Sequence, residues 1–207
     1  CEYFRLGALA VSPDGTMLAF STDTNGSERF TLKVIEIASG EVLTTAIENC
    51  AGSVIWNADS HGFAYRLVNE NWRPDRALYR ELTSGEDTLL YQEKDDSFFV
   101  GLGLSQSEQL MFISSGDHVT SEVRFVPRDN LRAEQTLIAT RREGHEYDVE
   151  HQGDDAKTGR LIIRSNRNHP NFDLFETPVA TPEEVHWQIL LPGDESHYLM
   201  GHVAFAD

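Results

Sequence analysis

The fold is decided by the stretch Leu9-Ala10-Val11-Ser12-Pro13-Asp14-Gly15-Thr16-Met17-Leu18-Ala19-Phe20-Ser21. Apolar and β-branched residues on both sides of Pro-Asp-Gly predict two short strands joined by a tight turn. Pro presets the first dihedral of such a turn, and Gly tolerates a positive φ. The stretch therefore predicts a β-hairpin. No stretch of the chain shows a clear helical periodicity of apolar residues.

The hairpin pattern is repeated along the chain, in residues 53–65, 103–113 and, more weakly, 147–164. The equivalent residues Ser12, Asn57, Ser105 and His151 are 45, 48 and 46 positions apart. A Ser-Gly turn follows the first two hairpins, at residues 39–40 and 84–85, again 45 positions apart. Four short strands in each repeat of about 45 residues are typical of the blades of a β-propeller. We therefore predict an all-β fold, a β-propeller.

The repeat predicts that residues 1–207 form one partial propeller domain with four blades, approximately 6–50, 51–96, 97–144 and 145–196. Residues 197–207 are predicted to start a fifth blade, with His202-Val203-Ala204-Phe205 as its first strand. The less regular stretch 178–184 is predicted to connect the third and fourth strands of blade four. An immunoglobulin-like sandwich or two stacked β domains are the alternatives, and the matched Ser-Gly turns argue against them.

The composition is strongly acidic, with 17 Lys and Arg against 34 Asp and Glu and a formal net charge of −17. A negative field of this size repels phosphate backbones, so we predict no nucleic-acid binding and a preference for cationic partners. An acidic surface with few lysines is also typical of a salt-rich habitat. Composition alone does not separate these two explanations.

The chain shows no signal for membrane insertion or secretion. No apolar run approaches the roughly 20 residues of a membrane-spanning helix. Nor does the N-terminus have a cationic region followed by an apolar stretch. Two cysteines, 49 positions apart, are too few for a disulfide scaffold or a structural zinc site. The sequence therefore predicts a soluble, cytoplasmic protein with reduced thiols and no membrane partner.

Catalytic patterns are absent from the sequence. No G-x-S-x-G nucleophile elbow occurs. His145-Glu146 is followed by Val149 where a zincin helix requires a second His, so we predict neither a metal nor a cofactor. Adjacent carboxylates such as Asp95 and Asp96 point to opposite sides of a strand and do not form an acid–base pair. A glycosidase or lyase would need carboxylates on the innermost strands, where Glu150 is the single acidic exception. Residue chemistry alone predicts a scaffold or binding domain.

Several segments in a fixed order resemble one family of peptidases. They are Tyr3-Phe4-Arg5-Leu6-Gly7-Ala8-Leu9, Tyr91-Gln92-Glu93-Lys94-Asp95-Asp96, Gly144-His145-Glu146-Tyr147 and Arg164-Ser165-Asn166-Arg167. Together they resemble the oligopeptidase B branch of the prolyl oligopeptidase family of serine peptidases. The resemblance implies a seven-bladed propeller that covers an α/β-hydrolase domain carrying a Ser, Asp and His triad. It also implies cleavage of short peptides after Arg or Lys.

These 207 residues contain no α/β-hydrolase domain and no triad residue, so we predict that this chain is not itself catalytic. Its expected role is to gate and dock substrates for such an endopeptidase. The partners implied are the parent protein's own C-terminal α/β-hydrolase domain and short basic peptides. Exposed blade edges also predict self-association. The alternative is a stand-alone propeller that serves as a protein-interaction module.

A candidate interdomain face follows from the propeller register. The loops between second and third strands, and those between blades, share one face of a propeller, and here the former are long and polar. The candidate residues are Glu28, Arg29, Arg73, Arg76, Glu93, Asp95, Asp96, Arg142, Glu143, His145 and Glu146. Their mixed charges suit a surface that opens and closes against another domain. The alternative is that they are ordinary solvated loop charges.

Overall fold

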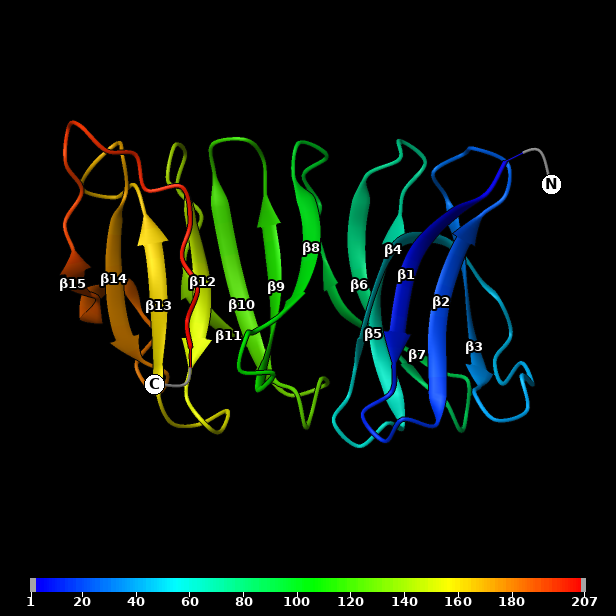
Figure 1. Ribbon diagram of the computed structural model, residues 1–207. Coiled ribbons are helices and arrows are strands. Elements are labelled where there is room, and N and C mark those ends of the chain that lie inside the picture. Colours follow the sequence, from blue (N-terminus) through cyan, green and yellow to red (C-terminus); the bar gives the residue numbers. More distant parts are fainter. Residues whose placement is uncertain (1–2, 206–207) are drawn as a thin grey trace. The chain divides into compact units, whose positions relative to one another are not determined.

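The computed structural model describes residues 3–205, which form antiparallel β-sheets (Figure 1). The strands are β1 (Arg5–Val11), β2 (Met17–Asp23), β3 (Phe30–Glu36), β4 (Ile47–Trp56), β5 (Gly62–Val68), β6 (Pro74–Glu81), β7 (Asp87–Gln92), β8 (Phe99–Leu104), β9 (Leu110–Gly116), β10 (Ser121–Pro127), β11 (Thr136–Ala139), β12 (Tyr147–Gln152), β13 (Arg160–Ser165), β14 (Asp173–Pro178) and β15 (Gln188–Leu191). A three-residue 3₁₀ helix, η1 (Glu184–His186), precedes β15. The all-β prediction is confirmed.

Neighbouring strands in each sheet follow one another in the chain. β1 to β7 form a seven-stranded sheet, while β8 to β11 and β12 to β15 form two four-stranded sheets. The chain divides into two compact units: unit 1 holds Cys1–Leu102 and Asp129–Arg132, and unit 2 holds Gly103–Arg128 and Ala133–Asp207. Within residues 3–205, no helix is long and apolar enough to cross a membrane.

The repeated hairpins share one hydrogen-bonding pattern. In each, the backbone N–H of the first turn residue donates to a carbonyl five positions later, in the pairs Ser12–Met17, Asn57–Gly62 and Ser105–Leu110, all at 2.9 Å. The fourth residue of each turn has a left-handed backbone: Gly15 (φ 75°), Ser60 (φ 63°) and Glu108 (φ 58°). Four residues lie between the bonded pair in each hairpin, and loops of this length are most often built around a type I turn. The sequence repeat is thus a repeat of backbone geometry, even where glycine is missing.

Strand β4 is long because it pairs with two neighbouring strands, β3 and β5. Its first half pairs with β3, at Leu32↔Ile47. Its second half pairs with β5, at Val54↔Tyr65 and Trp56↔Phe63. Gly52, at φ 76°, lies where the register shifts, and this left-handed conformation is unfavourable for residues with a Cβ. The bend at Gly52 joins two four-strand repeats into the single seven-stranded sheet.

Each unit has its own apolar core. In unit 1 the buried cluster is Ala19, Phe30, Leu32, Val34, Ile47, Cys50, Trp56, Phe63 and Tyr65. In unit 2 the cluster includes Leu110, Phe125, Leu161, Phe175 and Trp187. Burial alternates along β3 but is continuous along β9 from Leu110 to Ile113, as expected for a strand covered on both faces.

Two details of the predicted blades can be compared with the strands. Residues 179–187 connect β14 to β15, as predicted for the stretch 178–184. The predicted strand His202–Phe205 is not found: these residues are in no sheet. The segment is held instead by single contacts, such as that of His202 Nε2 with the carbonyl of Ile162 at 3.1 Å. The physical reason is that a strand needs a hydrogen-bonded partner strand, and within residues 3–205 no strand follows β15.

The described cysteine is Cys50, which is a free, buried thiol. Burial raises the pKa of this thiol to about 12, so it stays protonated and unreactive near neutral pH. Cys1 lies outside the described residues.

Candidate functional site

In unit 1, Arg29 fastens the β2–β3 loop to the β5–β6 loop. Its Nη2 donates to the carbonyls of Asn69 and Glu70 at 3.0 and 3.2 Å. Its guanidinium lies over the ring of Trp72, 4.6 Å from the centroid. The Trp72 Nε1–H donates in return to the carbonyl of Ser27 at 2.7 Å. Each loop therefore donates hydrogen bonds to the other. Arg29 stabilises this loop arrangement in addition to carrying a charge.

The β2–β3 loop is shaped by one buried carboxylate. Asp23 accepts the backbone N–H groups of Asn25, Gly26 and Glu28 at 3.0, 3.0 and 2.7 Å. Burial alone would raise the pKa of Asp23, but these hydrogen bonds outweigh burial and lower it. The side chain of Glu28 points outward to Arg5, at 3.2 Å, and both are exposed. Glu28 is thus held at the surface by a loop whose backbone is fixed.

Three further candidates lie beside the same loops of unit 1. Arg73 lies over the ring of Phe99, 4.7 Å from the centroid. Arg76 pairs with Asp75 at 3.0 Å. The backbone N–H of Glu93 donates to the carbonyl of Asp75 at 2.9 Å. The structure therefore brings Arg73, Arg76 and Glu93 together around β6 and the loop that follows β7.

The adjacent carboxylates in this loop have different surroundings. Asp95 Oδ1 accepts the backbone N–H of Ser97 at 2.9 Å and so closes a turn. Asp96 is exposed. Both residues lie in the loop between β7 and β8, not on a strand as the sequence argument assumed.

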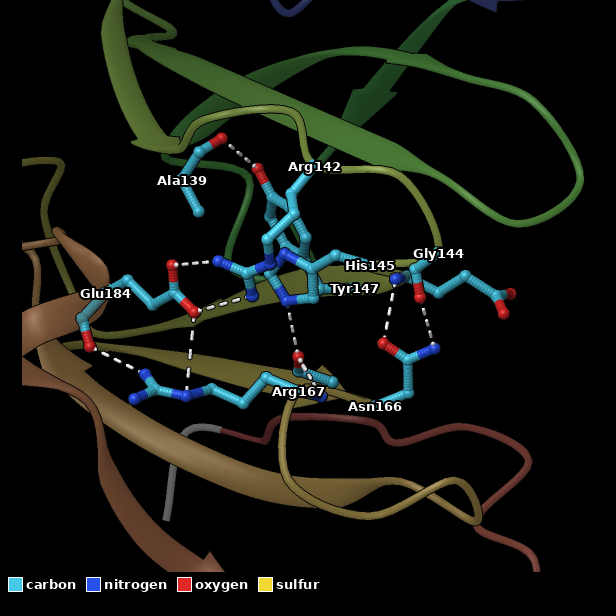
Figure 2. Close-up of polar contacts among 10 residues, drawn as sticks. Ala139, Arg142, Gly144, His145, Tyr147, Asn166, Arg167 and Glu184 are labelled. Atoms are coloured by element: carbon cyan, nitrogen blue, oxygen red, sulfur yellow. Dashed lines mark hydrogen bonds and ion pairs between the residues drawn. The ribbon is translucent and has the colours of Figure 1, made fainter.

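In unit 2, two arginines converge on one carboxylate (Figure 2). Arg142, in the β11–β12 loop, binds Glu184 through both Nη atoms, at 3.2 and 3.0 Å. Arg167, just after β13, brings its Nε within 3.6 Å of Glu184 Oε1 and donates from Nη1 to the Glu184 carbonyl at 2.8 Å. The hydrogen bond from Arg142 is the main cause of the lowered pKa of Glu184, which is therefore ionised at neutral pH.

His145 lies beneath this ion cluster and differs from the surface position predicted for it. Only 2% of the residue is exposed. Its Nε2 lies 2.9 Å from Ser165 Oγ, and its ring stacks on Tyr147 with 5.1 Å between centroids. Burial, with a smaller contribution from Arg142, lowers the pKa of His145. The imidazole is therefore neutral near pH 7 and acts as packing, not as a surface charge.

Tyr147 joins two sheets of unit 2 through its hydroxyl. The group accepts the backbone N–H of Val123 at 2.7 Å and donates to the carbonyl of Ala139 at 2.8 Å. Val123 and Ala139 are ladder partners at the point where the β10–β11 register shifts. The hydroxyl thus takes the place of a missing ladder hydrogen bond and ties β12 to the neighbouring sheet.

The other candidates in this loop have minor roles. Asn166 holds the loop, because its side-chain amide accepts the N–H of Glu146 at 2.9 Å and donates to the carbonyl of Gly144 at 3.0 Å (Figure 2). Glu146 is half-buried and Glu143 is exposed.

The sequence reasoning missed Arg167 and Glu184. Arg167 lies in a segment that carried the family resemblance, whereas nothing in the sequence pointed to Glu184.

The structure offers no support for the glycosidase or lyase alternative. Glu150 Oε1 accepts the backbone N–H groups of Gln106 and His151, at 2.8 and 2.7 Å, so this carboxylate is used in holding a turn. Within residues 3–205, no three His, Cys, Asp or Glu side chains gather as metal ligands would.

Comparison with known proteins identifies the family. Residues 2–207 match the family model described as prolyl oligopeptidase, N-terminal beta-propeller domain. The chain belongs to this family. The predicted resemblance is therefore confirmed, and so is the propeller fold.

Relatives of this domain are peptidases that are much longer than the chain. It is 30% identical to Protease 2 of Moraxella lacunata over 182 residues, which cover 86% of this chain and 26% of that protein. It is 29% identical to dipeptidyl aminopeptidase BI of Pseudoxanthomonas mexicana over 195 residues, covering 90% and 26%. The chain thus spans about a quarter of the length of these relatives.

Solved structures agree on the fold. Oligopeptidase B from Leishmania major superposes with a TM-score of 0.88 at 20% identity, over 96% of this chain and 28% of that one. Oligopeptidase B from Trypanosoma brucei gives a TM-score of 0.81 at 24% identity, over 93% and 27%. The chain is therefore a propeller domain of a prolyl oligopeptidase-family peptidase.

Proposed function

We propose that the chain is the substrate-gating and docking part of an oligopeptidase B-like serine endopeptidase that cleaves short peptides after Arg or Lys. The observation that carries the proposal is the match of residues 2–207 to the propeller domain of this family. The Ser, Asp and His triad would lie in an α/β-hydrolase domain elsewhere in the parent protein. The chain's own contribution is to admit short peptides and to exclude folded proteins.

The proposed domain organisation is a partial seven-bladed propeller, with four blades at 6–50, 51–96, 97–144 and 145–196 and the start of the next at 197–207. The repeated left-handed turn of the first three hairpins supports this register. The two four-stranded sheets, β8–β11 and β12–β15, fit the third and fourth blades.

The proposed partner surface consists of the loops between second and third strands and those between blades. Its charged groups include exposed ion pairs such as Arg5–Glu28, at 3.2 Å. Such pairs contribute only about 0–1 kcal/mol each, so they can break and re-form as two domains open and close. A solved prolyl endopeptidase structure is similar to this chain, with a TM-score of 0.76 at 23% identity. In that work inter-domain dynamics is given a role in the catalysis and specificity of two prolyl endopeptidases.

The net charge of −17 supports steering of cationic peptides toward the parent enzyme. This steering should weaken as salt is added, because the Debye length is about 8 Å at physiological ionic strength. A cytoplasmic location is part of the proposal and rests on the sequence alone.

The experiment is charge reversal in the parent enzyme. Glu28→Lys should change kcat/KM for an Arg-containing peptide while leaving folding intact, because Glu28 is an exposed side chain on a fixed loop. The matched controls, Glu41→Lys and Glu86→Lys, lie in exposed Ser-Gly turns at the opposite ends of their strands and should have little effect. Equal effects from both sets would contradict the proposed face. A gene that ends near codon 207, without a downstream G-x-S-x-G motif, would favour the stand-alone interaction module.

A further inference from the structure

The ion cluster of Arg142, Arg167 and Glu184 has two cations for one anion. Arg160 of the same unit pairs with Glu176. Glu122 is likewise shared by two arginines, Arg124 and Arg141, but its side chain is only 11% exposed. The Arg142 side chain is 51% exposed, whereas those of Arg167 and Glu184 are 29% and 25% exposed. One positive charge is therefore left over, at a position that solutes can reach through the exposed side of Arg142.

The chain itself shows what this position binds. Glu184 is held by Arg142 in a two-point arrangement, with both Nη atoms facing both carboxylate oxygens at 3.0–3.2 Å (Figure 2). Guanidinium and carboxylate groups match in this geometry, which gives strong and directional binding. The neutral imidazole of His145 adds no competing charge beneath the cluster, and its Nδ1 is buried without a hydrogen-bond partner. The nearby Glu183 faces His186 at 4.0 Å.

We propose that Arg142 and Arg167 form a binding site for the free α-carboxylate of a peptide, with Glu184 as the built-in occupant that the peptide displaces. The inference rests on the proposed function, since it supplies a means of recognising short peptides. A carboxylate at a flexible chain end can reach Arg167, whose side chain is 29% exposed, as well as the exposed Arg142, whereas one on a folded surface is held away. In a short peptide the C-terminus is always close to the bond that is cleaved, so a site of this kind would favour short substrates.

The test uses the 207-residue protein and two probes without charged side chains, N-acetyl-Gly-Ala-Ala as the free acid, which is an anion at neutral pH, and its uncharged C-terminal amide. Binding is followed by NMR of the arginine Nε–Hε resonances of Arg142 and Arg167. The acid should bind about tenfold more tightly than the amide, because charged hydrogen bonds are lost in the amide. Equal binding of the two probes would overturn the proposal. Neither probe has a basic residue, so this result does not depend on whether the parent enzyme cleaves after Arg or Lys.

Variants of the cluster should have opposite effects, which a purely structural ion pair would not produce. Glu184→Gln should tighten binding of the acid about tenfold, because the internal competitor is removed. Arg142→Gln should weaken it by a similar factor, and Arg142→Lys, which keeps the charge but loses the two-point geometry, should also weaken it. Arg160→Gln and Glu176→Gln are the matched controls and should change nothing.

Two outcomes of these measurements would contradict the inference. Weaker binding of the acid by folded Glu184→Gln protein would show that Glu184 supports the site instead of competing for it. Acetate that binds as tightly as the peptide acid would show that no peptide is recognised. The dispersion of the backbone amide resonances of each variant reports whether it is folded.

Discussion

Replacing Tyr147 by Phe removes one oxygen atom from the interior of unit 2 and leaves two backbone groups without a partner. The hydroxyl now satisfies the N–H of Val123 at 2.7 Å and the carbonyl of Ala139 at 2.8 Å. Val123, Ala139 and Tyr147 are 6%, 5% and 3% exposed, so water cannot replace the hydroxyl without entering the core. The substitution preserves the ring and its stacking on His145.

The magnitude follows from these two groups. A buried donor or acceptor that loses its partner costs about 1–3 kcal/mol. Phe no longer requires burial of a hydroxyl, which offsets part of the cost. We therefore expect Tyr147→Phe to lower the free energy of unfolding of unit 2 by about 2–4 kcal/mol. The effect should be local, because the hydroxyl takes the place of one ladder hydrogen bond between β10 and β11.

The assay is hydrogen exchange of the Val123 amide and of the other amides of β10 and β11, measured at increasing urea concentrations. Tyr198→Phe is the control, because Tyr198 is 57% exposed, and it should change stability by less than about 0.5 kcal/mol. A loss below about 0.5 kcal/mol for Tyr147→Phe, with Val123 still protected, would refute the reasoning. It would mean that β11 closes directly onto β10 once the oxygen is gone.

Three further outcomes are expected. The 207-residue protein should show no turnover of Arg- or Lys-containing fluorogenic peptides, and turnover abolished by a serine-directed reagent in protease-free samples would contradict this. Burial lowers the folded-state pKa of His145 below its ordinary value of 6.5, so its stabilising effect is complete above about pH 6.5 and is lost as the pH falls. Urea titrations at pH 7.5 and 5.5 should therefore show a smaller pH-dependent loss in His145→Gln than in the wild type, and equal losses would count against it. Edge strands β1 and β15 expose Leu9, Val11, Ile189 and Leu191, so light scattering should show self-association, whereas a 23.3 kDa monomer at high concentration would argue against it.

The strands were predictable because the signals for them are local. Alternating apolar residues and the turn at Ser12 and Asp14 define the first hairpin, and the same pattern identifies its copies. The hairpin pattern predicted the turns more generally than glycine did, since Ser60 and Glu108 adopt the same left-handed conformation as Gly15. At Ser60 and Glu108 the hydrogen bonds of the turn hold the backbone in this conformation.

The site was predictable only in part, because its geometry depends on tertiary packing. Arg142 and His145 were identified as polar residues of one loop, but their sequence positions do not reveal that one is half-exposed and the other buried. Glu184 reaches Arg142 from the connection between β14 and β15, 42 residues away. Contacts of this kind follow from the path of a loop, for which the sequence carries no periodic signal.

The account depends most directly on the proposed partner surface being covered by a catalytic domain. Hydrogen exchange measured on the 207-residue protein, and on the same residues within the full parent protein, tests this claim. The account predicts that amides in residues 24–29, 69–76, 93–98, 140–146 and 165–171 gain protection in the parent protein. The Ser-Gly turns at 39–40 and 84–85 should exchange equally in both. Protection of those turns instead of the loops, or of neither, would contradict it.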